Sequence, residues 1–463
     1  MKIYIFGTGY HYRRILKYMN DDDILALIDN DKEKQNTFIN GKKVISPENA
    51  KFELCDFVVI FVYSFDDIYN QLIDFGVSKD KILHYKKIGD ILGLTLQIEF
   101  ENKFYMPGKF LHNNNNVFLG IHEFSRTGVP VAVMNTALLL REMGYNVVMG
   151  AMSEGNLVSE LKENKLPYVG NLEIFSVDQW RNFVSKFSFV ILGTTCVAEF
   201  GNAIAYSNIP IIWWLNESNE ATYQYYKLPA TQNNIHYYAG GKRVYNIFSR
   251  FYPGVKIEEL LYFLPDDIVR GNKKRNVKFK FALIAYFEMR KAQDVFITAI
   301  EKLPLNLREK AEFILVGDSS ISRYGMELSK KKEHIPQLVL LGEVSQTELK
   351  NVFDEIDVLV CPSRDDPMPI VVTQAMQHGI PCVVSNQVGQ AEYINHMENG
   401  IVVEAGNAGA LAEAMRYCME NPEKILLMGE ASKRIFQENF SEDRMRKKLR
   451  DMIDSVYNAE GCI

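Results

Sequence analysis

The residues best suited to chemistry lie in one stretch, Cys361–Ser385, which reads CPSRDDPMPIVVTQAMQHGIPCVVS. An apolar run ends at Cys361 and a polar loop follows. Pro369 suits a first helical position, because that position needs no backbone N–H donor. A helix is predicted over Ile370–His378, and Gly379 suits the left-handed residue that ends a helix. A helix N-terminus that follows a parallel strand in this way is an anion-binding site.

Two side chains of this stretch are placed to reach a ligand held against the helix end. Asp366 lies at the mouth of the loop, and Gln374 follows after 7 intervening residues, about one turn into the helix. We therefore take both as candidate ligand contacts. The alternative is an ordinary strand–helix–strand unit of any doubly wound protein, with no ligand.

Length and composition describe a globular chain of 463 residues, with room for roughly three domains. The net charge of −6 gives no general attraction to nucleic acid. The start, MKIYIFGTGYHYRR, lacks a signal-peptide core, and no apolar run approaches ~20 residues, so no membrane span is predicted. Without a CxxC pair, the cysteines predict reduced thiols and no zinc site. They are Cys55, Cys196, Cys361, Cys382, Cys418 and Cys462.

Residues 1–95 form a unit of alternating strands and helices with a glycine-containing first turn. Gly7 and Gly9 lie in that turn, and Asp29 ends the second strand about 20 residues later, which is nearly a dinucleotide fingerprint. Tyr12 replaces the third glycine, which would allow close helix–strand packing. The predicted elements are a strand at Lys2–Phe6, a helix at Arg13–Met19 and a strand at Ile24–Ile28.

Three interpretations of this first unit stay open. It resembles the small Rossmann-like domains that precede bacterial sugar-modifying enzymes and some glycosyltransferases, which also carry the string Asp29-Asn30-Asp31 after the second strand. The resemblance implies nucleotide or sugar-nucleotide binding. A docking or oligomerising domain with a vestigial loop is the competing interpretation. An NAD-dependent enzyme is the third, but the rest of the chain offers it no partner residues.

The stretch around Asp366 resembles the donor-site signature of family 4 glycosyltransferases, which have the GT-B fold. Their signature is an acidic residue, then seven residues, then Glu in a Glu-Ala-Met string that continues to Gly-x-Pro-Val. Asp366 takes the place of the first Glu and Gln374 that of the second. The positions that agree in register are Ala375, Met376, Gly379 and Pro381.

Other parts of the chain extend this resemblance. Lys291 matches the family lysine that meets the donor diphosphate, and Arg290 substitutes for an Arg that relatives carry at the preceding strand end. Asn216 replaces the His of a Trp-x-x-His-Glu-Ser string, in which Glu217 is retained. The implied donor-binding residues are Lys291, Arg290, Gly342, Glu343, Met368, Pro369, Ile370, Gln374, Gly389 and Gln390.

The first turn of the next domain resembles the GT-B loop that approaches the donor diphosphate and the acceptor. Thr127 and Gly128 are the matching positions, before a helix predicted from Pro130 to Met143. A turn that needs glycine for its geometry alone is the alternative. Among all these residues, the resemblance implies catalytic roles for Asp366, Asn216 and Lys291.

The implied fold is α/β: two doubly wound Rossmann-like domains that face a cleft, preceded by the smaller domain. The predicted boundaries are an accessory domain at 1–95, a linker at 96–116, an acceptor domain at 117–268, a donor domain at 278–440 and a crossover helix at 441–463. A hinge is placed near 268–277. Its basic run Lys273, Lys274 and Arg275 is either a solvated face or a contact with an anionic membrane surface.

The implied reaction moves a sugar from a nucleoside diphosphate to an acceptor hydroxyl with retention, without a metal ion or another cofactor. The implied setting is the synthesis of bacterial surface polysaccharide in the cytoplasm, at the inner membrane face, with a glycan or lipid-linked acceptor. The departures at Asn216, Asp366 and Gln374 motivate an alternative, a non-catalytic GT-B protein that binds a partner enzyme or a glycan. The first domain is also a candidate homo-oligomer interface.

Overall fold

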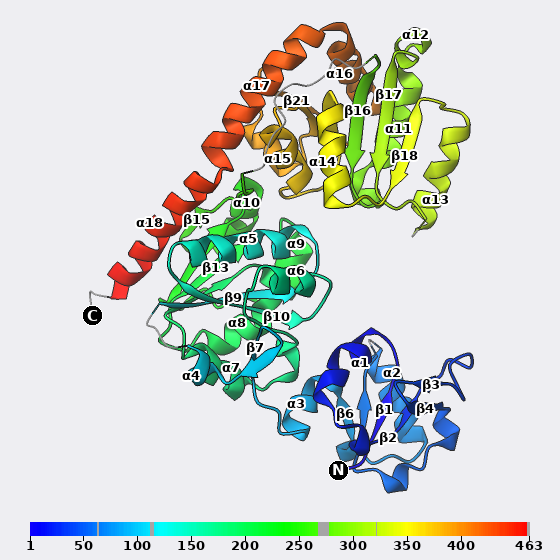
Figure 1. Ribbon diagram of the computed structural model, residues 1–463, viewed down its shortest axis with the longest axis vertical. Coiled ribbons are helices and arrows are strands. Elements are labelled where there is room, and N and C mark those ends of the chain that lie inside the picture. Colours follow the sequence, from blue (N-terminus) through cyan, green and yellow to red (C-terminus); the bar gives the residue numbers. More distant parts are fainter. Residues whose placement is uncertain (63, 112–114, 267–276, 321, 461–463) are drawn as a thin grey trace. The chain divides into compact units, whose positions relative to one another are not determined.

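The chain folds into three sheets with helices around them, shown in the computed structural model of Figure 1. Two compact units divide it, Met1–Ile211 and Ile212–Ile463. The hinge predicted near 268–277 lies outside the described residues except for its last position, and its basic run lies outside them entirely. The described residues are 1–62, 64–111, 115–266, 277–320 and 322–460.

The first unit begins with a six-stranded sheet (blue in Figure 1), as the alternating strands and helices of residues 1–95 predict. Its strands are β1 (Ile3–Phe6), β2 (Ile24–Ile28), β3 (Phe38–Ile39), β4 (Lys42–Ile45), β5 (Phe57–Ile60) and β6 (Ile82–His84), in the order β3-β4-β2-β1-β5-β6. Its helices are α1 (Tyr10–Ile15), α2 (Phe65–Asp74) and α3 (Ile88–Ile91). The two predicted strands are confirmed, but α1 begins at Tyr10 and not at Arg13, because Gly9 is extended and caps it.

The rest of the first unit consists of strands β7 (Ile98–Phe100), β8 (Lys103–Tyr105), β9 (Asn116–Glu123), β10 (Asn146–Ser153), β11 (Tyr168–Val169) and β12 (Phe189–Leu192). The stretch predicted as a linker is therefore partly a hairpin, β7–β8, which pairs antiparallel with β11. Helices here are α4 (Pro107–Phe110), α5 (Gly128–Glu142), α6 (Val158–Glu163), α7 (Val177–Val184) and α8 (Ala198–Ile204). Helix α5 begins two residues before Pro130, which is tolerated because first-turn N–H groups have no helical partner.

The second unit first adds β13 (Ile211–Leu215), α9 (Glu220–Tyr225), β14 (Ile235–Ala239), α10 (Lys242–Phe251) and β15 (Ile257–Glu259). These strands belong to a nine-stranded sheet with the order β15-β14-β13-β12-β9-β10-β11-β7-β8. Then follows a six-stranded parallel sheet of β16 (Phe279–Ile284), β17 (Ala311–Val316), β18 (Leu338–Gly342), β19 (Val358–Cys361), β20 (Cys382–Ser385) and β21 (Gly400–Val403). Its order is β18-β17-β16-β19-β20-β21, so β16 and β19 are neighbours at its centre.

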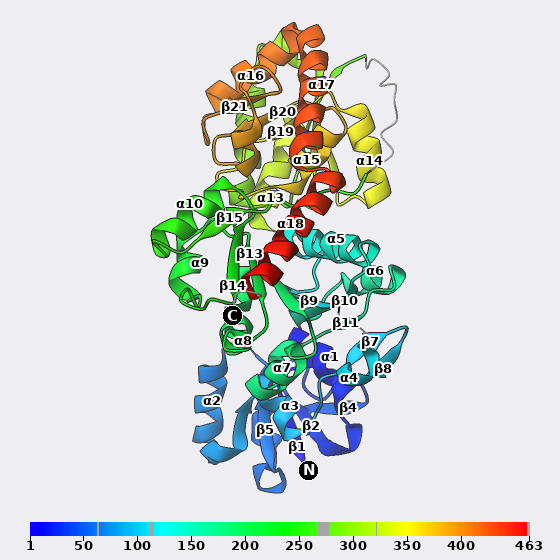
Figure 2. The same ribbon diagram turned by 90° about the vertical axis from the view of Figure 1, so that its left-hand side faces the viewer.

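Helices cover this last sheet: α11 (Gln293–Lys302), α12 (Leu305–Arg308), α13 (Arg323–Ser329), α14 (Gln346–Glu355), α15 (Ile370–Gln377), α16 (Ala408–Glu420), α17 (Pro422–Asn439) and α18 (Glu442–Glu460). Helix α11 packs on α16. Helix α15 packs beside α17, as Figure 2 shows. Buried Phe281, Phe296 and Phe313 anchor the core between sheet and helices.

The last helix, α18, has a buried apolar stripe. Met445, Leu449, Met452, Ile453 and Val456 of α18 are at most 3% exposed. Among the helices that the structure describes, we find none with both the length and the apolar character required to cross a bilayer.

Candidate active site

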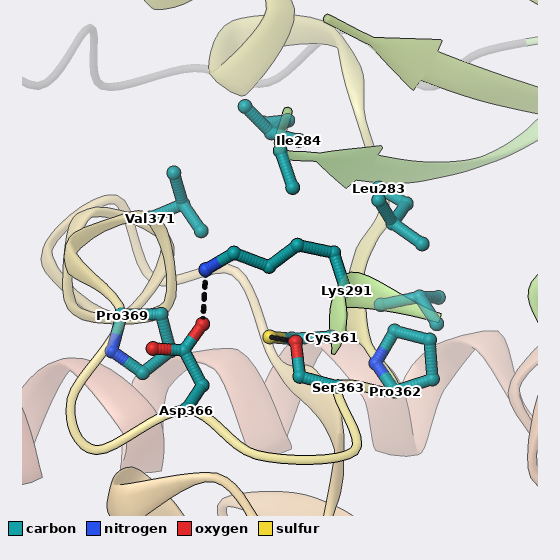
Figure 3. Close-up of a pocket in the computed structure, with 11 residues that line it drawn as sticks. Leu283, Ile284, Lys291, Cys361, Pro362, Ser363, Asp366, Pro369 and Val371 are labelled. Atoms are coloured by element: carbon teal, nitrogen blue, oxygen red, sulfur yellow. Dashed lines mark hydrogen bonds and ion pairs between the residues drawn. The ribbon is translucent and has the colours of Figure 1, made fainter. Parts of the chain in front are cut away.

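Lys291 and Asp366 meet at the centre of the last sheet. Because β16 and β19 are adjacent and parallel, the loops that follow them start at the same edge. Lys291 ends the 3-10 turn after β16, and its Nζ lies 2.5 Å from Oδ2 of Asp366, which belongs to the loop after β19. Figure 3 shows the lysine side chain extended towards this carboxylate. Asp366 is only 8% exposed at its side chain, so the pair is partly desolvated.

The pocket beside this pair is small. Its empty volume is about 230 Å³, part of it open to solvent, which is below the ~300–1,000 Å³ typical of pockets for whole small molecules. Cys361 and Ser363 line it together with the start of α15 (Figure 3). Burial, followed by the charge of Asp366, raises the pKa of the Cys361 thiol to about 11, so this thiol stays neutral and is a poor nucleophile.

Two arginines extend the positive charge around the aspartates. Arg290 donates from Nη1 to the Asp365 carbonyl at 2.9 Å and lies 3.8 Å from Oδ1 of Asp366. Arg243, at the start of α10, donates from Nη2 to Oδ1 of Asp365 at 2.8 Å and also donates to the Gln387 carbonyl. Three cations thus face two carboxylates, an arrangement suited to an anion with more than one negative charge.

A bidentate ion pair fixes the loop that carries Asp366. Arg364 donates to both carboxylate oxygens of Asp294, at 2.9 and 2.6 Å. Burial would raise the pKa of Asp294, but hydrogen bonds from Arg364 and from the Tyr324 hydroxyl outweigh it and lower that pKa. Asp294 is therefore ionised near neutral pH, and the loop keeps a charged anchor.

The first turn of α15 rests on a buried polar network. The helix begins at Ile370, as predicted, and Pro369 is its N-cap and not its first helical residue. Tyr262 Oη lies 2.6 Å from Oγ1 of Thr373, and Gln390 donates to the Pro369 carbonyl at 2.8 Å. This network fixes the direction in which the helix N-terminus points.

Gln390, a predicted donor contact, lies behind the start of α15. It is 0% exposed, and its Nε2 donates to Tyr262, Pro369 and Thr373, while its predicted role stays a prediction. Gly389 allows a close approach of two loops: a Cβ there would lie 1.6 Å from the Pro367 carbonyl oxygen. Its amide donates to the Asp366 carbonyl at 2.9 Å, so in this structure it holds the loop.

The other predicted donor-binding residues lie on three different parts of the last sheet's domain. Met368 lies in the Asp366 loop, and Gln374 faces partly outward from α15. Gly342 has a φ of +72°, which favours glycine, and Glu343 after it is exposed. Both follow β18 at the sheet's edge, and none of the contacts found among the described residues joins them to Lys291.

Asn216 follows β13 and donates from Nδ2 to the Trp214 carbonyl at 3.1 Å. Its backbone amide donates to the Glu217 carboxylate at 3.2 Å. Ser218 donates to Oδ1 of Asp365 at 3.5 Å, so this turn does reach the loop of Asp366. The roles suggested for Asn216 and Glu217 stay predictions.

The predicted residues of the first unit lie in two separate turns. Thr127 caps α5 with extended backbone, and its Oγ1 lies 2.9 Å from Oγ of Ser125, with Gly128 as the first helical residue. In the first sheet, Gly7 has a φ of +100°, and Gly9 caps α1.

The carboxylate of Asp29 is occupied by its own loops. Thr8 donates to Oδ2 of Asp29 from its hydroxyl at 2.6 Å, and the Asp31 amide donates to Oδ1 at 3.0 Å. Burial would raise the pKa of Asp29, but these hydrogen bonds lower it. Asp29 is thus hydrogen-bonded within its own loops, and its role in binding a nucleotide stays a prediction.

Sequence reasoning missed Arg243, Asp365 and the role of Tyr262. The Gly240-Gly241 pair before Arg243 signals a strand–helix turn, but its partner Asp365 is 122 residues away. No local pattern predicts that pairing. Among the described residues, we find no cluster of three His, Cys, Asp or Glu side chains that could hold a metal ion.

Comparison with known families gives the family of this chain. "Glycosyl transferases group 1" matches residues 266–435, and "Glycosyl-transferase family 4" matches 113–236. The chain belongs to the group 1 and family 4 glycosyltransferases. A third family, "C2185-like, N-terminal", matches residues 1–83, the accessory domain.

Individual relatives match shorter parts of this glycosyltransferase. An uncharacterized glycosyltransferase of Methanocaldococcus jannaschii is 34% identical over 105 residues, 23% of this chain and 27% of that protein. The UDP-Gal:alpha-D-GlcNAc-diphosphoundecaprenol alpha-1,3-galactosyltransferase of Escherichia coli is 26% identical over 160 residues, 33% of this chain and 39% of that protein. The chain thus spans well under half the length of both relatives.

Solved structures confirm the fold that the resemblance implied. HepE from Anabaena, in complex with UDP-glucose, matches with a TM-score of 0.62 at 15% identity. The match covers 73% of this chain and 99% of that one. The GT-B fold is therefore shown, with an additional α/β domain before it.

Proposed function

We propose that this glycosyltransferase moves a sugar from a nucleoside-diphosphate sugar to a hydroxyl of a glycan or lipid-linked acceptor, with retention of anomeric configuration. The observation that carries the proposal is the Lys291–Asp366 pair, 2.5 Å apart in front of α15. A lysine, a helix N-terminus and an acidic side chain converge there, as a diphosphate joined to a sugar requires.

The chemistry follows from where charge develops. As the bond between sugar and diphosphate breaks, negative charge grows on the leaving phosphate, and fixed positive groups lower the barrier. Lys291, Arg290 and the first amides of α15 supply them, so the reaction proceeds without a divalent metal. Asp366 then orients sugar hydroxyls, while Gln374 bonds the ribose, as the family resemblance implies.

The acceptor side is assigned by resemblance to the turns at Thr127-Gly128 and Asn216-Glu217. The E. coli relative is named for an acceptor linked to diphosphoundecaprenol, which supports a lipid-linked acceptor for this protein as well. Such an acceptor lies in a membrane, so we place the reaction at the inner membrane face, with the enzyme bound peripherally.

A second candidate is a GT-B protein that binds a partner enzyme or a glycan without turnover. It is favoured by the engagement of Asn216, whose Nδ2 is committed to the Trp214 carbonyl where relatives have a His. Asparagine carries no charge and moves no proton, so a catalytic His function is lost there.

The deciding experiment is a thermal-shift panel of UDP-, GDP-, dTDP- and CDP-sugars. Ligands that bind the native state raise the melting temperature by mass action, worth ~2.7 kcal/mol at a hundredfold excess over Kd. We expect one nucleotide to stabilise the wild type and Lys302→Ala, an exposed control lysine in the following helix, but not Lys291→Ala. If no sugar nucleotide stabilises the wild type, the donor site is refuted.

Turnover with the nucleotide found then separates enzyme from binding protein. The double variant Asn216→His, Gln374→Glu should raise turnover of an active transferase. A protein that only binds a partner gains nothing from it. The anomeric configuration of the product, read by NMR, tests retention.

A further inference from the structure

The accessory domain reaches a specific loop of the next domain within the first unit. Tyr10 of α1 donates its hydroxyl to the Glu154 backbone carbonyl at 2.9 Å. Lys17, in the 3-10 turn after α1, forms an ion pair with the Glu154 carboxylate and lies 3.6 Å from Glu99. Glu154 is thus held at both its main chain and its side chain.

The contact around Glu154 is part of a close-packed interface. Arg14 pairs with Glu173 at 2.5 Å, with side-chain exposures of 8% and 11%, and the Tyr85 hydroxyl donates to the other oxygen of Glu173 at 3.0 Å. A Cβ on Gly89 would lie 2.1 Å from the Ile174 carbonyl oxygen, so two backbones touch there. The accessory domain and the next domain therefore pack against each other through specific contacts within the first unit.

Glu154 begins the loop between β10 and α6, and this loop contacts the 124–128 turn. The Leu157 amide donates to the Phe124 carbonyl at 2.8 Å, and the Arg126 amide donates to Oδ1 of Asn156 at 3.1 Å. A Cβ on Gly155 would lie 2.4 Å from the Phe124 carbonyl oxygen, so the two loops are in direct contact. Any shift of residues 154–157 therefore displaces the 124–128 turn.

We propose that Lys17 and Tyr10 are positioning residues: through Glu154 they hold the 154–157 loop, and with it the 124–128 turn, in the conformation that receives the acceptor. The mention of the acceptor rests on the proposed function. The mechanical link from the accessory domain to the turn does not. The accessory domain then supports the acceptor side of the GT-B fold.

Hydrogen–deuterium exchange of the full chain tests the link without any ligand. In Lys17→Met, backbone amides in peptides covering 124–128 and 154–157 should exchange about tenfold faster, because their local opening becomes easier. Lys17→Arg keeps the charge and should resemble the wild type. Lys42→Met is the matched control, since Lys42 donates to the Asp21 carbonyl, a contact within its own domain.

A second variant keeps the test decisive if Lys17→Met loosens its own domain. Tyr10→Phe removes one hydroxyl from a ring that is 54% exposed, and it should speed exchange in the same two peptides by a smaller factor. Unchanged exchange at 124–128 in both variants overturns the proposal.

Kinetics adds a readout that a loss of fold alone would not give. Lys17→Met should raise the KM for the acceptor several-fold, while the thermal shift produced by the nucleotide sugar stays that of the wild type. If no nucleotide sugar binds the wild type, the proposed function fails, yet the exchange result still decides the link. An equal loss of donor and acceptor affinity would contradict a positioning role.

Discussion

The first and last sheets of this protein have the same size but use their carboxyl edges in opposite ways. Both contain six strands with parallel strands at the centre. At the edge of the first sheet, the Thr8 hydroxyl donates to the Asp29 carboxylate, and Tyr10 of α1 donates to a backbone carbonyl of the next domain. At the edge of the last sheet, Lys291 and Asp366 flank an open pocket in front of α15.

The comparison teaches that topology supplies an edge, while side chains decide its use. A parallel sheet brings several loops together at its carboxyl end whatever their sequence. In the first sheet the third fingerprint glycine is Tyr12, which is 0% exposed and fills the space between helix and strand. In the last sheet, Lys291 and Asp366 line a small pocket at this edge instead. Four changes test this contrast.

The largest effect on stability is expected at the Arg14–Glu173 ion pair, where the first sheet's domain packs on the next domain. Arg14→Met leaves the Glu173 carboxylate, 11% exposed, without its cation and with the Tyr85 hydroxyl still donating to it, so we expect a loss of up to ~3 kcal/mol in unfolding free energy, the low end for a desolvated pair. Denaturant unfolding, followed at the transition of the first unit, measures it. Arg13→Met is the control, because Arg13 is exposed. Adding Glu173→Leu to Arg14→Met should recover most of the loss, and no recovery would contradict the explanation.

Removing the carboxylate from the last sheet's edge should strengthen nucleotide binding. Asp366 competes with a diphosphate for Lys291, so Asp366→Asn should tighten binding of the free nucleoside diphosphate by ~1.5–3 kcal/mol. Sugar transfer should fall in the same variant. Calorimetric titration measures the affinity, with exposed Asp451→Asn as the charge-matched control. Weaker binding would mean that Lys291 needs Asp366 to hold it in place.

The stability of the first unit should also depend on pH, because His11 near this interface has a shifted pKa. Burial, and then the charge of Arg14, lowers the pKa of His11 from 6.5 to about 4, and its ring stacks on Tyr85 at 4.7 Å. Between these values the unfolded chain binds the extra proton. Stability is therefore full above pH ~6.5 and falls as the pH drops, by up to ~2 kcal/mol at pH 5.

Melting temperatures of the wild type and His11→Gln at pH 7.5 and pH 5 measure this term. Glutamine keeps an acceptor for Arg14 but does not titrate. The loss of stability on acidification should therefore be smaller in His11→Gln. Equal losses in both proteins would place the titrating groups elsewhere.

The smallest effect is expected at Gln374 on the last sheet's edge. Gln374→Glu restores a charged acceptor for ribose hydroxyls, and we expect nucleotide binding to tighten by ~1–2 kcal/mol. The gain should shrink for the 2′-deoxy form of the same nucleotide, which is the matched control. An equal gain for both nucleotides would indicate that Gln374 does not face the ribose.

Local sequence alone determined the elements of the proposed donor site. Pro369, Gly379 and the strand residues around them predicted one strand–helix–strand unit, and the structure has β19, α15 and β20 there. Gly379 has the expected positive φ of +67°. These features depend on the backbone preferences of residues a few positions apart, so no distant partner is needed to predict them.

Only the tertiary structure decided which side chains meet. Lys291 finds Asp366 across 75 residues because β16 and β19 are neighbours, and Arg243 finds Asp365 across 122. Gln390 is buried behind the helix, where its Nε2 donates to the Pro369 carbonyl. The pairing of parallel strands is non-local, and the burial of a polar group depends on every neighbour around it, so neither is recorded in a short motif.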